Sequence, residues 1–271
     1  MAGFFGLFNY EKEGPGVEKN APKKKTFIVF FETFFRNVWK FITINFVFCL
    51  MSLLIIPKGF ADAGFTHVAR NTARDKHSFG LSDFFETIKK NWKQALIINI
   101  INIIVTGLDV FALVWYFNAE KSAAQTIGLG IAIFVAFIFS VMQFYIWTLT
   151  ISFKLSVKNI YGNSFKLAIV NLKMNLLCVF AHLLVYVLYF LVIYYLGRFS
   201  LVIAFAFMLF VCTFPGFSFL LIQYCTFPAI KKYMIDPYYA EHPDDDIELR
   251  RNLGLEVPED DADEEDEEIE E

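Results

Sequence analysis

Hydrophobic residues in this chain occur in long blocks, and most charged residues lie between the blocks or at the two ends. Four blocks cover residues 94–117, 126–153, 174–196 and 199–223, and a shorter one covers about 41–57. A helix needs about 20 apolar residues to cross the roughly 30 Å of hydrocarbon in a bilayer. Lipid-facing backbone must hydrogen-bond within its own segment, so such blocks form helices. The pattern predicts an all-α fold, a polytopic membrane helix bundle of about five transmembrane helices.

The segments outside the blocks divide the chain into three parts. We predict a polar N-terminal tail at 1–25, a membrane helix-bundle domain at 26–235 and an acidic, disordered C-terminal tail at 236–271. Residues 26–40 repeat a charged side chain every four positions among phenylalanines, which fits either an interfacial helix or the first turns of the following span. A second amphipathic, basic segment runs from Ser82 into the block at 94–117.

Composition and charge exclude several classes of protein. Hydrophobic residues make up 56% of the chain and charged residues 19%, whereas soluble domains carry about 45–50% and 25%. This excludes a soluble enzyme, a disordered chain and a secreted domain held by disulfides. Residues 241–271 hold 17 acidic residues against Arg250 and Arg251, so the membrane portion is basic and the tail strongly acidic. We expect the bilayer to be the main partner, and no nucleic acid.

Lysine and arginine counts predict the orientation. The segments between and after the blocks carry seven, one, four, one and two of these residues in chain order. Basic residues accumulate on the cytoplasmic side of short loops. The segments 57–93 and 154–173 and the C-terminal tail are therefore expected in the cytoplasm, and the protein in the plasma membrane as a multi-pass protein.

The first block leaves two alternatives. If 57–93 is cytoplasmic and 41–57 crosses once, the N-terminal tail lies outside, although residues 1–40 carry seven basic residues of their own. Otherwise the segment from Phe41 to Gly64 enters the membrane and returns, which the break Pro57-Lys58-Gly59 would permit if other helices cover it. Length and hydrophobicity favour a crossing.

Polar residues inside the blocks form one stripe on each of three predicted helices. They are costly in hydrocarbon and often functional. The candidate polar interior consists of Asn99, Asn102 and Asp109 on the second block, Gln143 on the third, and Asn175 and His182 on the fourth. These side chains either line a polar path for a ligand or ion, or form hydrogen bonds between helices.

Motifs for enzymatic or metal chemistry are absent from the sequence. It contains no phosphate-binding loop, no zinc-binding His pair and no nucleophile elbow. The four cysteines have no metal-ligand spacing and are read as packing residues. We therefore expect no catalytic residues, no metal and no cofactor.

Three stretches of this sequence resemble the YesL family of bacterial integral membrane proteins, whose biochemical function is not established. They are Phe8-Asn9-Tyr10 through Lys25, Phe84-Phe85 through Leu96, and Phe227-Pro228-Ala229 through Tyr233. Pro57-Lys58-Gly59-Phe60 departs from the Thr-x-Gly-Pro-like turn typical of that family, and the acidic tail looks like an addition. The resemblance implies a plasma-membrane protein often associated with carbohydrate uptake, and it supplies no catalytic residues.

Two functional hypotheses follow. The first is a non-enzymatic accessory or regulatory component of a carbohydrate transport system, whose partners are transporter subunits or other membrane proteins. The alternative is a small transporter or channel with a polar path lined by the second to fourth blocks. A lipid-modifying enzyme is a third, weaker hypothesis, because the expected motifs are missing.

Overall fold

The computed structural model describes residues 26–196 and 200–242 as helices joined by short turns, with no strand in these two ranges. The helices are α1 (Thr26–Arg36), α2 (Val38–Ser52), α3 (Ile55–Ala73), α4 (Leu81–Asn118), α5 (Ala123–Ser152), α6 (Val157–Val170), α7 (Leu172–Leu196), α8 (Ser200–Ile230), the π-helix η1 (Lys231–Ile235) and α9 (Asp236–Glu241). The predicted all-α class is confirmed. The tail predicted at 1–25 and most of that at 236–271 lie outside the described residues, whereas 236–241 are helical.

Four helices are long and apolar enough to cross a membrane. They run over Leu81–Asn118, Ala123–Ser152, Leu172–Tyr195 and Phe205–Glu241, and a fifth crossing would require the bent pair α1 and α2. Only 11%, 11%, 6% and 11% of their most apolar stretches are buried within the protein. Because so much hydrocarbon-like surface is exposed, lipid is the solvent that suits these helices. The protein is a multi-pass membrane protein by these criteria.

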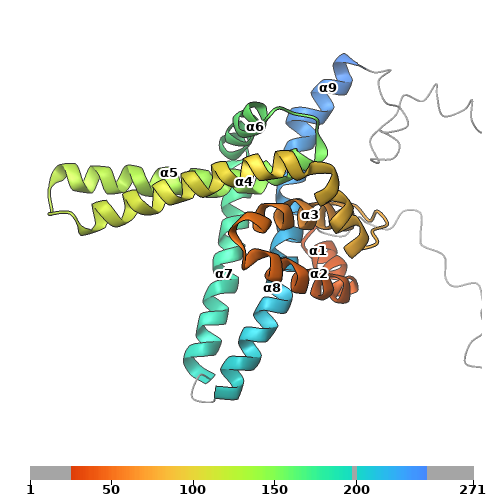
Figure 1. The fold of residues 1–271 in the computed structure, drawn as a ribbon, viewed down its shortest axis with the longest axis horizontal. Coiled ribbons are helices and arrows are strands. Elements are labelled where there is room, and N and C mark those ends of the chain that lie inside the picture. The colour runs from red at the N-terminus through yellow and green to blue at the C-terminus, as the bar shows by residue number, and fades with distance from the viewer. Residues whose placement is uncertain (1–25, 197–199, 243–271) are drawn as a thin grey trace, which may run out of the picture.

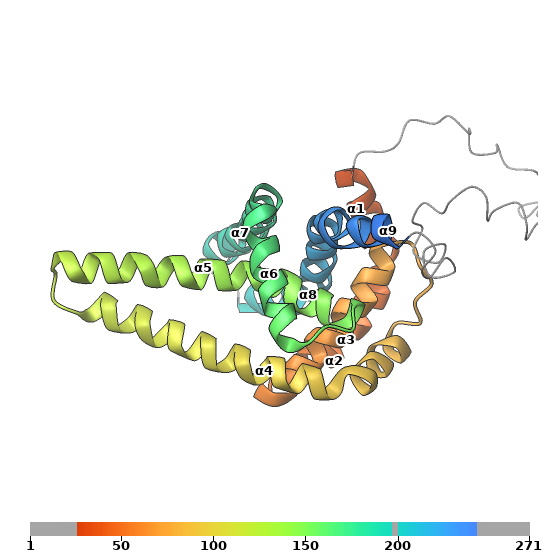
Figure 2. The same ribbon diagram turned by 90° about the horizontal axis from the view of Figure 1, so that it is seen from above.

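The long helices form two hairpins that leave a common base in different directions. Figure 1 shows α4 and α5 side by side pointing away from the base, and α7 and α8 side by side along another direction. Figure 2 shows the same separation from above, with α1, α2 and α3 gathered around α8. The short helix α6 connects the base of α5 to α7.

The first hydrophobic block does not form a single helix. Helix α2 ends at Ser52, α3 begins at Ile55, and Pro57 lies in the first turn of α3, where a missing N–H is tolerated. The two helices run antiparallel: Arg36 forms an ion pair with Asp75, and Lys40 Nζ donates to Thr72 Oγ1 at 3.4 Å. Both outer ends of this α2–α3 hairpin therefore lie together, and the apolar turn at residues 53–56 lies at the other end.

An aromatic core holds the α2–α3 hairpin against α8. Phe41 stacks on Phe65 with ring centroids 6.2 Å apart, and both side chains are fully buried. Gly216 on α8 permits this packing, because a Cβ at that position would lie 2.7 Å from the Cβ of Phe41. Small residues let helices in membranes approach closely, so this glycine fixes the distance between α2 and α8.

Candidate functional site

A polar cavity of about 480 Å³ lies among α3, α4, α5 and α8. Its lining combines amides, a hydroxyl and an ion pair with aromatic and aliphatic side chains: Lys58, Asp62, Asn99, Asn102, Ile103, Thr106, Gln143, Phe144, Trp147, Phe219 and Ile222. Three of the predicted interior residues, Asn99, Asn102 and Gln143, are thus brought to one place. The volume falls within the range of about 300–1,000 Å³ typical of ligand pockets.

An ion pair that was not predicted from the sequence forms the α3 wall of the cavity. Lys58 Nζ donates to Asp62 Oδ2 at 2.6 Å, one helical turn away. The Asp62 side chain is 7% exposed and that of Lys58 is 52% exposed, so the carboxylate is enclosed while the ammonium reaches the cavity. A buried carboxylate needs a charged or hydrogen-bonding partner. The i, i+4 spacing of two opposite charges in a stretch of small residues was the available sequence signal.

Asn99 connects the beginning of α3 to α4. Its Nδ2 donates to the carbonyl oxygens of Ile55 at 3.0 Å and Ile56 at 3.1 Å. Gly59 makes room for it, because a Cβ there would lie 2.4 Å from the Asn99 Cβ. The Asn99 amide is therefore held by the backbone and closes one end of the cavity instead of offering free donors to a ligand.

Asn102 and Gln143 form a reciprocal amide pair between α4 and α5. Asn102 Nδ2 donates to Gln143 Oε1 at 2.9 Å, and Gln143 Nε2 donates to Asn102 Oδ1 at 3.2 Å. Tyr161 on α6 donates its hydroxyl to Asn102 Oδ1 at 2.7 Å and also contacts the carbonyl oxygen of Ile98 at 3.3 Å. Each amide keeps unused donor or acceptor capacity, so the pair can bind a further polar group in the cavity.

The other predicted interior residues lie away from this cavity. Asn175 accepts from the Tyr145 hydroxyl at 2.7 Å and donates to the Ala168 carbonyl at 2.9 Å, which satisfies the last turn of α6. His182 contacts Ser218 Oγ through Nε2 at 2.7 Å and joins α7 to α8. Both residues therefore form hydrogen bonds between helices, which was the predicted alternative to a polar path.

Asp109 is half-buried on α4 and does not line the polar cavity. Within the described part of the chain it has no hydrogen-bond or ion-pair partner. Asp109 and His182 sit on different hairpins, so the structure does not bring these two titratable groups into one site. Among residues 26–196 and 200–242, no three His, Cys, Asp or Glu side chains are placed to hold a metal ion.

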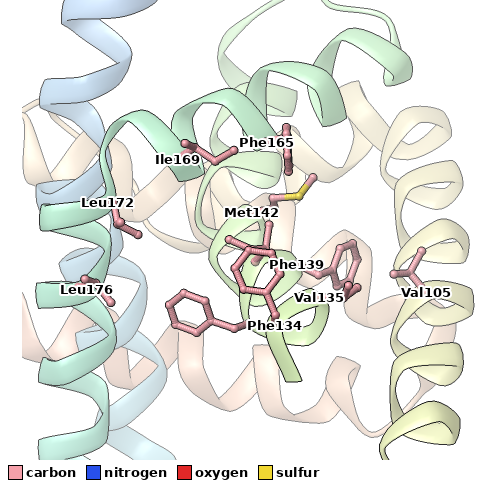
Figure 3. Close-up of a pocket in the computed structure, with 11 residues that line it drawn as sticks. Val105, Phe134, Val135, Phe139, Met142, Phe165, Ile169, Leu172 and Leu176 are labelled. Carbon is pink, nitrogen blue, oxygen red and sulfur yellow. The ribbon is translucent and has the colours of Figure 1, made fainter. Parts of the chain in front are cut away.

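A second space, the apolar groove, lies on the other side of α5. It measures about 680 Å³ and is lined by carbon and sulfur side chains alone: Val105, Phe134, Val135, Phe137, Ile138, Phe139, Met142, Phe165, Ile169, Leu172 and Leu176. Figure 3 shows Phe134, Phe139 and Met142 of α5 facing the space between α4 and α7, below Phe165 and Ile169 of α6. Acyl chains can fill such a groove without leaving any polar group unsatisfied.

These features define a class, a multi-pass α-helical membrane protein with a polar cavity lined by four helices. Residues 41–119 match the sequence model of a family described as "Protein of unknown function, DUF624". The matched segment covers less than half of the chain and runs from α2 through the end of α4, so it includes both members of the Lys58–Asp62 pair and two of the cavity amides. It also includes one of the three stretches that resemble the YesL family, and the two similarities are compatible. No curated protein and no solved structure matches the chain.

Proposed function

We propose that this protein is a non-enzymatic, solute-binding component of a membrane transport system, and that its solute is a small hydroxylated molecule of the carbohydrate class. One observation carries the proposal: a cavity large enough for a small solute combines a reciprocal amide pair, an ion pair and a tryptophan in a membrane protein. Polar groups are costly in such surroundings and are often retained for function.

The chemistry of the lining suits a polyhydroxylated ligand. Hydroxyl groups both donate and accept, as do the amides of Asn102 and Gln143, whereas Asp62 accepts and Lys58 donates. Trp147, Phe144 and Phe219 offer flat apolar surfaces against which the carbon face of a sugar ring can pack. The side chains in the cavity are suited to binding and orienting a solute; for this reason we propose no catalytic role.

We also infer that the α2–α3 hairpin enters the membrane and returns to the cytoplasmic side, so that α4, α5, α7 and α8 make four crossings. The Arg36–Asp75 and Lys40–Thr72 contacts support this, because they join the outer ends of the hairpin. Helix α2 has 15 residues, about 22 Å, which is short of the roughly 30 Å hydrocarbon core. Both termini would then be cytoplasmic. So would the other six basic residues of 57–93, whereas Lys58 lies near the turn inside the membrane, and this distribution agrees with the charge rule. A topology reporter fused before Thr26 should give a cytoplasmic signal, and an external signal would refute the inference.

The proposal is tested by ligand-dependent stability of the purified protein in a sugar-free detergent. D-glucose, D-xylose and maltose are the probes, and at least one should raise the Tm by several degrees, since a ligand at about 100 times its Kd adds about 2.7 kcal/mol. The double variant Asn102→Leu/Gln143→Leu should lose this shift. It removes both amides together, and Tyr161 keeps the Ile98 carbonyl as a partner.

A matched control lies on the same two helices. Asn118 Nδ2 donates to Val114 O at 2.8 Å, and Gln125 Nε2 donates to Tyr116 O at 2.7 Å, both remote from the cavity. The double variant Asn118→Leu/Gln125→Leu should keep the full ligand shift. Absence of any shift in the unchanged protein with all three sugars would contradict the carbohydrate class.

A second candidate function is that the chain itself conducts the solute. The observation in favour is the stripe on α4 that runs from Asn99 and Asn102 through Thr106 toward Asp109, beyond the cavity. Protein alone in proteoliposomes should then transport the sugar, and Asp109→Asn should reduce flux without changing membrane abundance. Binding without flux would favour the component of a larger system, which should co-purify with transporter subunits.

A further inference from the structure

Two arginines near the C-terminal end of α3 face a small cavity at the base of the molecule. Arg70 and Arg74 are four residues apart and so share one face of the helix. Arg70 Nη1 donates to Ser152 Oγ of α5 at 2.7 Å, and the Arg74 guanidinium lies over the Phe227 ring of α8 at 4.0 Å. These contacts orient both guanidinium groups between the ends of α5 and α8.

Neither arginine has a carboxylate partner within the described residues. Asp75, the carboxylate nearest in sequence, is paired with Arg36. The Arg70 Nε is buried and has no hydrogen-bond partner. Burial lowers the pKa of both guanidinium groups to about 10, and the charge of Arg70 adds to the effect on Arg74. Two adjacent, partly desolvated cations without a counter-charge are unfavourable unless an anion joins them.

The cavity beside them has room for such an anion. It measures about 150 Å³ and is lined by Thr26, Arg70, Ala73, Arg74, Gln223, Tyr224, Phe227 and Pro228. A single water needs about 10–15 Å³ of such space, so a tetrahedral group of five heavy atoms fits. Gln223 is 2% exposed and donates to Thr148 Oγ1 at 3.0 Å, while its Oε1 is buried without a partner. The site therefore offers several donors and one unused acceptor.

We propose that Arg70 and Arg74 bind a phosphate group in this cavity, contributed either by an anionic phospholipid headgroup of the cytoplasmic leaflet or by free phosphate. Guanidinium groups form charge-assisted, often bidentate hydrogen bonds with phosphate oxygens. Gln223 Oε1 accepts from a hydroxyl of the same group, either P–OH or the alcohol of a headgroup such as glycerol. This site does not depend on the proposed function of the polar cavity, although α3 contributes residues to both.

The experiment compares two phosphate sources on the full-length protein in an uncharged detergent. One arm measures the Tm in inorganic phosphate against chloride of equal ionic strength. The other arm measures retention of phosphatidylglycerol against phosphatidylcholine by native mass spectrometry. Stabilisation by phosphate alone assigns the site to free phosphate, and selective retention of phosphatidylglycerol assigns it to the headgroup; either outcome supports the site. No effect of phosphate and no selective retention overturns it.

Arg74→Gln is the informative variant, because Arg70 also holds Ser152 and its loss could disturb folding. Removing one charged donor should weaken binding about tenfold, and Arg74→Lys should restore part of it by restoring the charge. Arg36→Gln is the control, since Arg36 is 62% exposed and paired with Asp75 at the same end of the molecule. Equal losses of phosphate binding in Arg74→Gln and Arg36→Gln would mean that general surface charge causes the binding, and would overturn the proposal.

Discussion

The polar cavity and the apolar groove lie on two sides of α5, and only the cavity has polar and charged side chains in its lining. Gln143, Phe144 and Trp147 face the cavity, whereas Phe139 and Met142 face the groove. The cavity is lined by four helices that contribute amides and an ion pair, while the groove offers only side chains that acyl chains can cover. In a protein whose solvent is hydrocarbon, an apolar groove needs no functional explanation, and a cavity lined by amides and an ion pair does.

The largest expected effect concerns the ion pair in the cavity wall. Lys58→Met leaves the enclosed Asp62 carboxylate without its partner, and a buried acceptor left unsatisfied costs about 1–3 kcal/mol, toward the upper end for a charged group. We expect a large fall in Tm of the detergent-solubilised protein, with recovery in Lys58→Met/Asp62→Leu. Lys90→Met is the matched control: Lys90 and Glu86 have the same spacing and the same 2.6 Å distance, but both are exposed. Its effect should stay below about 1 kcal/mol, and equal losses in both variants would contradict the burial of the Asp62 carboxylate.

The next effect concerns the close contact that closes the cavity. Gly59→Ala places a methyl group against Asn99 and forces α3 away from α4, and overpacking of this kind costs about 1–3 kcal/mol. Gly107→Ala on α4 is the control, because no atom lies within 4 Å of the added carbon. That variant should keep or raise the Tm, since alanine favours a helix by about 1 kcal/mol over glycine. A Tm unchanged in Gly59→Ala would show that α3 and α4 are not packed as described.

The smallest expected effect is a difference in water access between the polar cavity and the apolar groove, measured at neighbouring positions on α4. Thr106 lines the polar cavity and Val105 lines the apolar groove. In a background with the four native cysteines changed to alanine, Thr106→Cys should react with a water-soluble cationic methanethiosulfonate about tenfold faster than Val105→Cys. A tenfold ratio corresponds to about 1.4 kcal/mol of difference in access. Equal reaction rates would mean that water has the same access to the cavity as to the groove.

The helical class and part of the site could be predicted from the sequence. Helical periodicity placed Asn99 and Asn102 on one face of a helix, and the structure joins both to Gln143 in the cavity. Periodicity does not say which helix covers a polar face, so Asn175 and His182 could not be separated from the cavity in advance. They satisfy the end of α6 and the contact between α7 and α8.

The contribution of α3 to the polar cavity could not be predicted from the sequence, for a physical reason. The first apolar block reads as one span by hydrophobicity, but its helix breaks after Ser52 and resumes at Ile55. This break turns the chain back, so that Lys58 and Asp62 become part of a packed helix instead of a loop. Burial of a segment as polar as α3 depends on the helices that cover it, which no local pattern reveals.

Helix α4 runs without interruption for 38 residues, about 57 Å, nearly twice the thickness of the hydrocarbon layer. Its first turns carry Lys89, Lys90 and Lys93 before the apolar part begins. Each degree of tilt of a rod this long displaces one end by about 1 Å relative to the other. As one uninterrupted helix, α4 would carry any tilt of its basic end to the wall that holds Asn99 and Asn102.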